Sequence, residues 1–366
     1  MEKVYMIAAG GTGGHFYPGY ALGMKLIERG HDVVFIIKTG NQSAAKILKD
    51  NEIFYHEIDC EAMPRSINPI KWFSFIKKFI KSYSYIRELI KSYKPLVCVG
   101  MGGYISFPLI LCAHFMGVKT AVHDSNSRLG FANKISKIFV DKVMLGLPLD
   151  KPIKNSVLVG TPIRKEFAQG LSQVEEGYWE LTSDFAINIL IFGGSQGARH
   201  LNLAASEMVL RMIKRTARIN FFHVSGRRDY EMLKEIYKDS PQVDLIEYAY
   251  DICALMRTSQ IIIARSGASS IAEIVSLQKP SILVPLPTAA DNHQYFNAKI
   301  LEDNGCALLV EDNKDLSANL EKALCSLLGD PKLLGSIQDN LRISPIPDPL
   351  EAADLCATQV ERLAIK

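Results

Sequence analysis

Short apolar runs alternate with longer amphipathic stretches along most of this chain. Short runs bounded by glycine, proline or polar residues predict buried strands, and apolar residues three and four apart predict helices. The first series of runs lies at 4–9, 32–37, 96–99, 119–123 and 142–145, with helical stretches such as 21–28, 44–49 and 70–92 between them. A second series lies at 187–192, 220–224, 243–247, 261–264, 281–284 and 307–310. The alternation predicts βαβ units and parallel sheets.

The periodicity is interrupted around 148–185, where prolines and charges accumulate. We therefore expect an N-terminal domain over 1–162 and a C-terminal domain over 163–347. After the prolines at 345, 347 and 349, the segment 348–366 carries a helical pattern. Two placements of this helix are open: it caps the C-terminal domain, or it packs back on the N-terminal domain.

A glycine-rich turn follows the first strand of each series. The first turn reads Gly-Gly-Thr-Gly-Gly-His over 10–15, and the second reads Gly-Gly-Ser-Gln-Gly-Ala over 193–198. Glycines allow a tight turn and a close approach to a ligand, and the N-terminus of the following helix directs free N–H groups at an anion. Two such turns predict two doubly wound α/β domains that face one nucleotide-linked ligand in a cleft.

Composition and charge narrow the class of protein. The chain has 366 residues, 48% of them hydrophobic and 22% charged, as in ordinary globular proteins, and a net charge of +3 that gives no reason to expect nucleic acid as a partner. Its seven cysteines are scattered without a C-x-x-C pair, which indicates core thiols in a reducing compartment. We read no signal peptide and no spanning segment, and expect a cytoplasmic protein with at most peripheral membrane contact.

Several polar residues could carry chemistry. His15 could take a proton from an attacking hydroxyl, or could simply cap a helix. The second turn offers backbone N–H groups and the Ser195 hydroxyl to a diphosphate, and no D-x-D motif or metal-ligand spacing accompanies it, so we expect neither a metal nor a cofactor. Glu273 could accept the hydroxyls of a ribose, or could merely stabilise a helix start. The polar segment 291–298 could bind sugar hydroxyls through its side chains, or could be a solvated loop.

A basic aromatic stretch occupies 70–87. Apolar residues recur there at helical spacing, and lysines flank them. This is the pattern of a helix that lies on an anionic membrane surface, and the alternative is a core helix with solvated lysines. The residues expected to contact the membrane are Trp72, Phe75, Lys77, Lys78, Phe79 and Lys81.

Five motifs follow one another along the chain: Gly10–His15 with Pro18 and Ala21, 100–104 (Gly-Met-Gly-Gly-Tyr), 193–198, 265–268 with Glu273, and His293-Gln294 with Asn297-Ala298. Taken in this order, they resemble the motifs of the MurG family of bacterial peptidoglycan N-acetylglucosaminyltransferases. The resemblance implies a GT-B glycosyltransferase with two Rossmann-like domains. It implies inverting transfer of N-acetylglucosamine from UDP-N-acetylglucosamine to the muramyl 4-hydroxyl of undecaprenyl-linked lipid I, forming lipid II at the cytoplasmic face of the membrane.

The resemblance also implies roles for individual residues. Ser195 would hold phosphate, the backbone of Ala249 would meet uracil, Glu273 would bind ribose and Gln294 the sugar. Gly102, Gly103 and Tyr104 would face the acceptor. The remaining donor-site residues would be Thr12, Gly13, Gly14, Asn126, Arg164, Ala268, Ser269, Ser270, Ile271 and Ala272. The family often has His-Glu-Gln-Asn where this chain has His-Asp-Ser-Asn over 123–126, so a catalytic role does not carry over to Asp124.

Two other functions fit the same architecture. A UDP-N-acetylglucosamine 2-epimerase or a glycolipid transferase would not need lipid I, and acceptor assays would separate them. A nucleotide-sugar-binding or membrane-docking subunit would not catalyse at all. A degenerate copy would tend to lose one of His15, Ser195, Glu273 and Gln294, and the chain retains all four.

Overall fold

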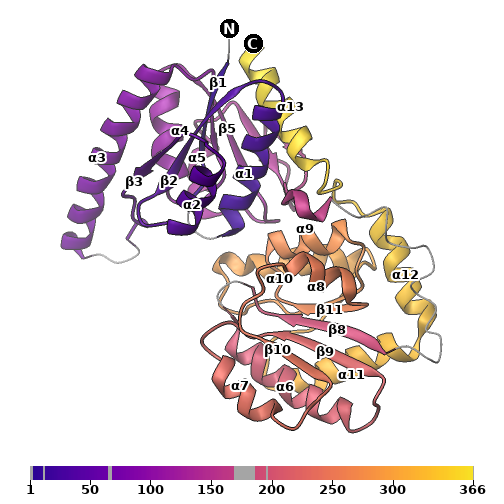
Figure 1. The fold of residues 1–366 in the computed structure, drawn as a ribbon. Coiled ribbons are helices and arrows are strands. Elements are labelled where there is room, and N and C mark those ends of the chain that lie inside the picture. The colour runs from indigo at the N-terminus through magenta and orange to yellow at the C-terminus, as the bar shows by residue number, and fades with distance from the viewer. Residues whose placement is uncertain (1–2, 11–12, 65–67, 169–185, 195–196, 366) are drawn as a thin grey trace. The chain divides into compact units, whose positions relative to one another are not determined.

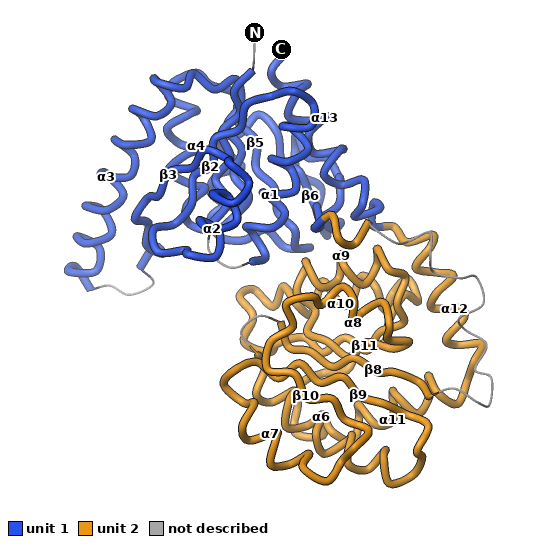
Figure 2. The backbone as a smooth tube through the Cα atoms, in the orientation of Figure 1, with its two compact units in different colours: residues 1–164, 346–366 blue, residues 165–345 orange. Residues whose placement is uncertain are grey.

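A computed structural model describes residues 3–10, 13–64, 68–168, 186–194 and 197–365. The chain forms two compact units (Figure 2). Unit 1 comprises Met1–Arg164 together with Ile346–Lys366, and unit 2 comprises Lys165–Pro345. Unit 2 is therefore inserted in sequence between two pieces of unit 1. The expected residues Thr12 and Ser195 lie outside the described residues.

Unit 1 is built on a parallel sheet of seven strands in the order β3-β2-β1-β4-β5-β6-β7. Strands β1 and β4 are neighbours although two other strands separate them in the sequence, so the chain order reverses between them. The strands are β1 (Val4–Ala8), β2 (Asp32–Lys38), β3 (Tyr55–Ile58), β4 (Val97–Gly100), β5 (Lys119–Asp124), β6 (Lys142–Leu145) and β7 (Ser156–Leu158).

Helices cover both faces of this sheet (Figure 1). Alternate residues of β1 enter opposite cores: Tyr5 and Ile7 pack beneath α1, α2 and α13, and Met6 and Ala8 pack beneath α3 and α4. Burial on both faces explains why the strand reads as a continuous apolar run. The helices are α1 (Gly13–Glu28), α2 (Gln42–Asp50), α3 (Pro69–Tyr93), α4 (Ser106–Phe115), α5 (Phe131–Ser136) and α13 (Ala352–Ile365).

The C-terminal helix α13 belongs to unit 1, where it packs along α1 (Figure 1). Cys356, Ala357 and Val360 are fully buried in the same core as β1. At the edge of this contact, Arg29 forms an ion pair of 2.9 Å with Asp354 and a second one with Glu361. The last helix of the chain thus completes the core that the first strand begins.

Unit 2 repeats the plan with six parallel strands in the order β10-β9-β8-β11-β12-β13. The strands are β8 (Ile187–Phe192), β9 (Ile219–Val224), β10 (Val243–Ile246), β11 (Ile261–Ala264), β12 (Ser281–Leu283) and β13 (Leu308–Leu309). The helices are α6 (Arg199–Ile213), α7 (Tyr230–Tyr237), α8 (Ile252–Thr258), α9 (Ala268–Ser276), α10 (His293–Asp303), α11 (Leu316–Gly329) and α12 (Pro331–Arg342). The predicted fold class, two Rossmann-like α/β domains, is confirmed.

Two details differ from the sequence-based expectation. Helix α1 begins at Gly13, eight residues before the expected helical stretch 21–28, so His15 lies in its first turn. Strands β3 and β7 were not expected, and both are edge strands of the sheet. Among the described helices, none has the length and apolar character needed to cross a membrane.

Candidate functional site

Each sheet has one point where the strand order reverses, and ligands of such folds bind beyond the carboxyl ends of the strands there. In unit 1 the point lies between β1 and β4, and in unit 2 it lies between β8 and β11. The glycine turn after β1 and the turn after β4 meet at the first point. The turn after β8 and the turn after β11 meet at the second.

At the edge of unit 1, the ring of His15 packs against the turn after β4. A Cβ atom on Gly102 would lie 2.7 Å from His15 Cδ2, and Gly102 has a φ of 92°. A Cβ atom on Gly103, whose φ is 73°, would approach the Gly10 carbonyl oxygen to 3.2 Å. Only glycine fits both positions, because each demands a left-handed backbone and a close approach. The imidazole of His15 is thereby placed against the backbone of the Gly102–Gly103 turn.

Asp124 organises the next turn, after β5. Its Oδ1 accepts hydrogen bonds from the backbone N–H of Asn126 at 3.1 Å and from the Asn126 side-chain amide at 3.3 Å. Its Oδ2 accepts from the N–H of Gly130 at 2.7 Å and from Asn133 Nδ2 at 3.0 Å. The carboxylate is buried, and both of its oxygens are occupied. Asp124 therefore holds Asn126 in position and has a structural role within unit 1.

Two further expected residues lie on unit 1. The guanidinium of Arg164 stands over the ring of Tyr17, 5.1 Å from its centroid, in a cation–π contact. Tyr104, directly after the Gly102–Gly103 turn, is 40% exposed. Gly13 and Gly14 form the first turn of α1, and Pro18 in the same helix has no N–H to donate to the Gly14 carbonyl.

In unit 2, the turn after β8 also depends on glycine. A Cβ atom on Gly193 would lie 2.4 Å from the Cβ of Ala198, and Gly194 and Gly197 have φ angles of 87° and 72°. The N–H of Gly197 donates to the Gly194 carbonyl at 3.0 Å, so this amide is engaged within the turn itself. Among the described residues, no side chain caps the N-terminus of α6, which directly follows. The first turn of α6 is therefore the stronger source of N–H groups for an anion.

Helix α9 follows β11, the strand that pairs with β8, so its N-terminus lies at the same edge of the sheet as that of α6. Within the described part of the chain, the N-terminus of α9 likewise lacks a side-chain cap. The Ser269 hydroxyl in its first turn is buried and has no hydrogen-bond partner among the described residues. A bound ligand could supply that hydrogen bond. Glu273 lies one turn further on and is half-buried. Ala268, Ile271 and Ala272 are buried and can offer a ligand only their backbone, whereas Ser270 is half-buried.

Gln294 is held in one orientation at the start of α10. Its Oε1 accepts from the N–H of Leu286 at 3.0 Å, and its backbone carbonyl accepts from the Ser266 hydroxyl at 2.8 Å. With the side-chain oxygen fixed in this way, the Nε2 group is the side-chain donor that can serve a ligand. Ala249 follows β10 and lies between the exposed Tyr248 and Tyr250, whose ring centroids are 5.0 Å apart.

One ionic cluster at this edge was not expected from the sequence. Asp312 Oδ2 pairs with Arg265 Nη2 at 2.6 Å, and Asp312 Oδ1 pairs with Nδ1 of His200. Arg265 precedes α9 and also donates to the carbonyls of Val284 at 3.1 Å and Pro285 at 3.2 Å. Asp312 thus ties the start of α6 to the turn before α9. No local sequence signal could have revealed a contact between segments so distant along the chain.

The basic aromatic stretch forms α3, and its apolar residues divide between two faces. Phe75 and Phe79 are half-buried, whereas Phe73 is 72% and Ile80 61% exposed. Ile76 is 48% exposed and lies on the same side of the helix as Ile80. Trp72 is half-buried, and Lys77 and Lys81 are exposed. Lys78 forms ion pairs with Asp59 at 3.1 Å and Glu61 at 2.5 Å.

Comparison with known proteins fits this geometry. The glycosyltransferase family 28 N-terminal domain matches residues 5–145, and the glycosyltransferase family 28 C-terminal domain matches residues 188–341. The chain belongs to glycosyltransferase family 28. It is 41% identical over 361 residues to the UDP-N-acetylglucosamine–N-acetylmuramyl-(pentapeptide) pyrophosphoryl-undecaprenol N-acetylglucosamine transferase of Elusimicrobium minutum, covering 99% of this chain and 100% of that protein.

Solved structures agree on the fold. The structure of Acinetobacter baumannii MurG superposes with a TM-score of 0.76 at 26% identity, over 99% of this chain and 100% of that one. A UDP-GlcNAc 2-epimerase from Neisseria meningitidis superposes with a TM-score of 0.64 at 14% identity, over 98% of this chain and 100% of that one. The second likeness concerns the GT-B fold alone. The resemblance drawn from the motifs, to the MurG family of UDP-N-acetylglucosamine-dependent transferases, is confirmed.

Proposed function

We propose that this enzyme transfers N-acetylglucosamine from UDP-N-acetylglucosamine to the muramyl 4-hydroxyl of undecaprenyl-linked lipid I, releasing UDP and forming lipid II. The observation that carries the proposal is the 41% identity to a transferase of that name over 99% of the chain. The reaction belongs to peptidoglycan synthesis and takes place at the cytoplasmic face of the cell membrane, where the enzyme is peripheral.

Unit 2, close to the expected 163–347, is the donor domain. The uncapped N-termini of α6 and α9 supply N–H groups and positive dipole ends to the diphosphate, which carries the developing charge as UDP leaves. Glu273 accepts the ribose hydroxyls, and the backbone of Ala249 meets uracil. Gln294 donates from Nε2 to the sugar. Ser195 serves the phosphate, and residues 268–272 line the same ligand.

Unit 1, close to the expected 1–162, is the acceptor domain. The Gly102–Gly103 turn faces the acceptor diphosphate, and His15 is the candidate base that takes the proton of the attacking hydroxyl. Thr12, Gly13 and Gly14 form the adjoining turn, and Asn126 and Arg164 reach the donor. Inversion requires a single in-line displacement through an oxocarbenium-like transition state, with C–O bond formation to the muramyl oxygen and departure of UDP.

The test is a transfer assay with radiolabelled UDP-N-acetylglucosamine and a short-chain lipid I analogue, run in excess EDTA. We expect a labelled disaccharide-linked lipid without added metal, because helix N-termini meet the leaving group. Conversion of the donor to its 2-epimer without acceptor would instead support the epimerase. A requirement for added Mg²⁺ or Mn²⁺ would contradict the leaving-group assignment.

A matched pair of variants tests the ribose assignment. Glu273→Ala should raise the donor KM about tenfold or more, because ribose hydroxyls lose a charged acceptor. Glu207→Ala, an exposed glutamate on α6, is the control and should leave KM unchanged. Equal donor KM values for the two variants, measured by initial rates, would remove Glu273 from the donor site.

A further inference from the structure

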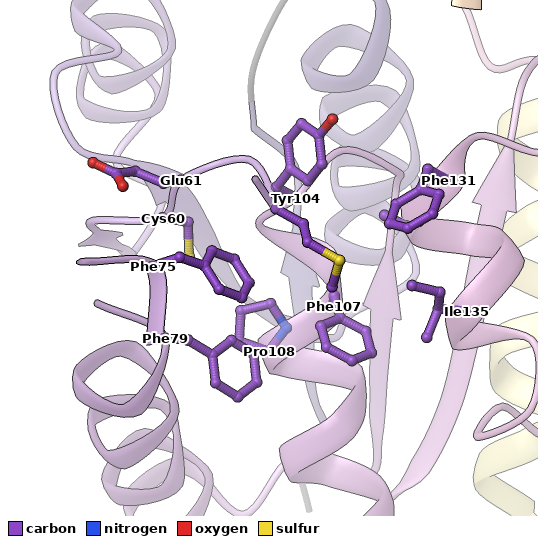
Figure 3. Close-up of a pocket in the computed structure, with 11 residues that line it drawn as sticks. Cys60, Glu61, Phe75, Phe79, Tyr104, Phe107, Pro108, Phe131 and Ile135 are labelled. Atoms are coloured by element: carbon purple, nitrogen blue, oxygen red, sulfur yellow. The ribbon is translucent and has the colours of Figure 1, made fainter. Parts of the chain in front are cut away.

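Unit 1 contains a pocket that the donor and the muramyl sugar do not need. It lies among the segment after β3, helix α3, the start of α4 and helix α5, and encloses ≈ 420 Å³, its open mouth included (Figure 3). Phe75, Phe79, Phe107, Phe131 and Ile135 supply much of its wall.

The pocket wall is apolar and its aromatic rings support one another. The ring centroids of Phe75 and Phe79 are 6.1 Å apart, and those of Phe79 and Phe107 are 5.8 Å apart. Glu61 is the one charged residue among the described residues that line the pocket, and its carboxylate is paired with Lys78 and points away from the rings (Figure 3). A peptide or a sugar would therefore leave its polar groups unsatisfied here, whereas a hydrocarbon chain would not.

The position of the pocket relates it to the acceptor. Tyr104 lines the pocket and directly follows the Gly102–Gly103 turn, against which His15 packs. The acceptor carries its polyprenyl chain on the diphosphate that this turn is proposed to face. The first isoprenoid units must therefore lie within a few atoms of Tyr104. An apolar pocket begins at that point.

Helix α3 connects the pocket with an exposed apolar surface. Phe75 and Phe79 face the pocket, while Phe73, Ile76 and Ile80 on another side of the same helix are 72%, 48% and 61% exposed. A chain too long for the pocket can continue beside this helix into the bilayer. The pocket and the exposed face thus offer one continuous route for a lipid tail.

We propose that this pocket binds the diphosphate-proximal isoprenoid segment of the lipid-linked acceptor. The inference rests on the proposed function, since it assigns a subsite for the substrate of that reaction. Burial of the first units draws the chain away from the bilayer and fixes the diphosphate against the Gly102–Gly103 turn. The remainder of the chain stays in the membrane.

The experiment compares two phenylalanines of unit 1 under the same substitution, with the full chain in detergent-free solution. Phe79→Ala removes a pocket wall, and Phe54→Ala removes a ring that is 72% exposed and lies outside the pocket and helix α3. The acceptors are a water-soluble short-prenyl lipid I analogue and an analogue with a methyl group in place of the prenyl chain. We expect Phe79→Ala to raise KM for the prenyl acceptor about tenfold, from the lost burial of hydrocarbon, and to leave KM for the methyl acceptor unchanged. Phe54→Ala should change neither value.

A second variant distinguishes an effect on the pocket from an effect on folding. Ala132→Leu adds volume inside the pocket, and it should raise KM for the prenyl acceptor while the donor KM stays unchanged. Calorimetric titration with a short prenyl diphosphate reports on the pocket without turnover, and both pocket variants should weaken that binding. Equal prenyl-acceptor KM values for wild type, Phe79→Ala and Ala132→Leu would overturn the pocket while leaving the transferase intact. Prenyl diphosphate binding that depends on Phe79, without transfer to any acceptor, would uphold the pocket and overturn the function.

Discussion

At the residue scale, the buried carboxylate of Asp312 connects the segments at the proposed donor site of unit 2. Its side chain is 3% exposed, and that of Arg265 is 6% exposed. If one charge is removed, water therefore cannot solvate the other. The two donor-side helices α6 and α9 follow different strands, and the Asp312 pairs with His200 and Arg265 link their starts. This contact fixes the spacing of the two N-termini that are proposed to meet the diphosphate.

Asp312→Asn should therefore lower the free energy of unfolding by about 3 kcal/mol, because Arg265 keeps a buried charge without its partner. The donor KM should rise in the same variant. Asp339→Asn, which breaks an exposed pair with Arg342 of 3.3 Å, is the control and should cost less than about 1 kcal/mol. Urea unfolding measures both, and equal losses would contradict a special role for Asp312.

His223 makes stability depend on pH. Its Nε2 faces the Oδ1 of Asn202 at 3.2 Å, and its Nδ1 faces the Tyr237 hydroxyl at 2.9 Å. The Asn202 amide group already donates to Ser225 and Asp229, so Oδ1 is an acceptor and His223 donates from Nε2 as a neutral ring. Complete burial lowers the pKa of His223 from 6.5 to about 3.

The direction of the pH effect on stability follows from which state of the protein binds the proton. Between pH values of about 6.5 and 3 the unfolded chain binds this proton and the folded chain does not, so His223 lowers stability as the pH falls through that window, by up to about 1.4 kcal/mol per pH unit. Above pH 6.5 the contribution is constant. His223→Gln should show a shallower loss of unfolding free energy between pH 6 and pH 4 than wild type. Identical slopes in urea unfolding would contradict this.

At the scale of elements, the sequence predicts the strands that are buried on both faces of a sheet and misses both edge strands of unit 1. Strand β1 sends alternate apolar residues into two cores, and its run was unambiguous. Strand β3 lies at an edge and includes His56 and Glu57, so the apolar signal of a strand is absent. The motif residues of the candidate site could be found because glycine turns and helix starts are local. The division of α3 into a pocket face and an exposed face depends on its contacts with α4 and α5. It could therefore not be predicted from the sequence.

Helix α3 should bind anionic membranes through its exposed side. Lys77→Glu with Lys81→Glu should weaken binding to anionic vesicles about tenfold or more, at about 1 kcal/mol for each basic residue near the surface. Lys78 is left unchanged because its ion pairs with Asp59 and Glu61 are structural. High salt should remove part of the wild-type binding and leave the apolar part.

The control for this charge reversal is Lys322→Glu with Lys332→Glu, two exposed lysines of unit 2. It should bind vesicles as wild type does, and turnover of a soluble acceptor should be the same in all three proteins. If vesicle sedimentation gives equal binding for both double variants, α3 is not the docking helix.

At the scale of the whole molecule, one chain forms two compact units. Val360 of α13 is fully buried against unit 1, although the residues of unit 2 precede it in the sequence. Val360→Ala should lower the stability of unit 1 by about 2 kcal/mol, from two lost methyl groups and the cavity they leave. Hydrogen exchange should quicken in β1 and α1 and stay unchanged in β8 and β11. Equal acceleration in both units would mean that they unfold as one.

The place of α13 also sets the order in which the protein can mature on the ribosome. Domains usually fold as they emerge, the N-terminal one first. Here the core around β1 lacks Cys356, Ala357 and Val360 until the final helix has been translated, whereas unit 2 has its whole sequence earlier. The half of the chain made first is thus the half finished last. A chain that stopped before Ala352 would contain all of unit 2 but an incomplete unit 1, which would expose apolar surface to chaperones and proteases.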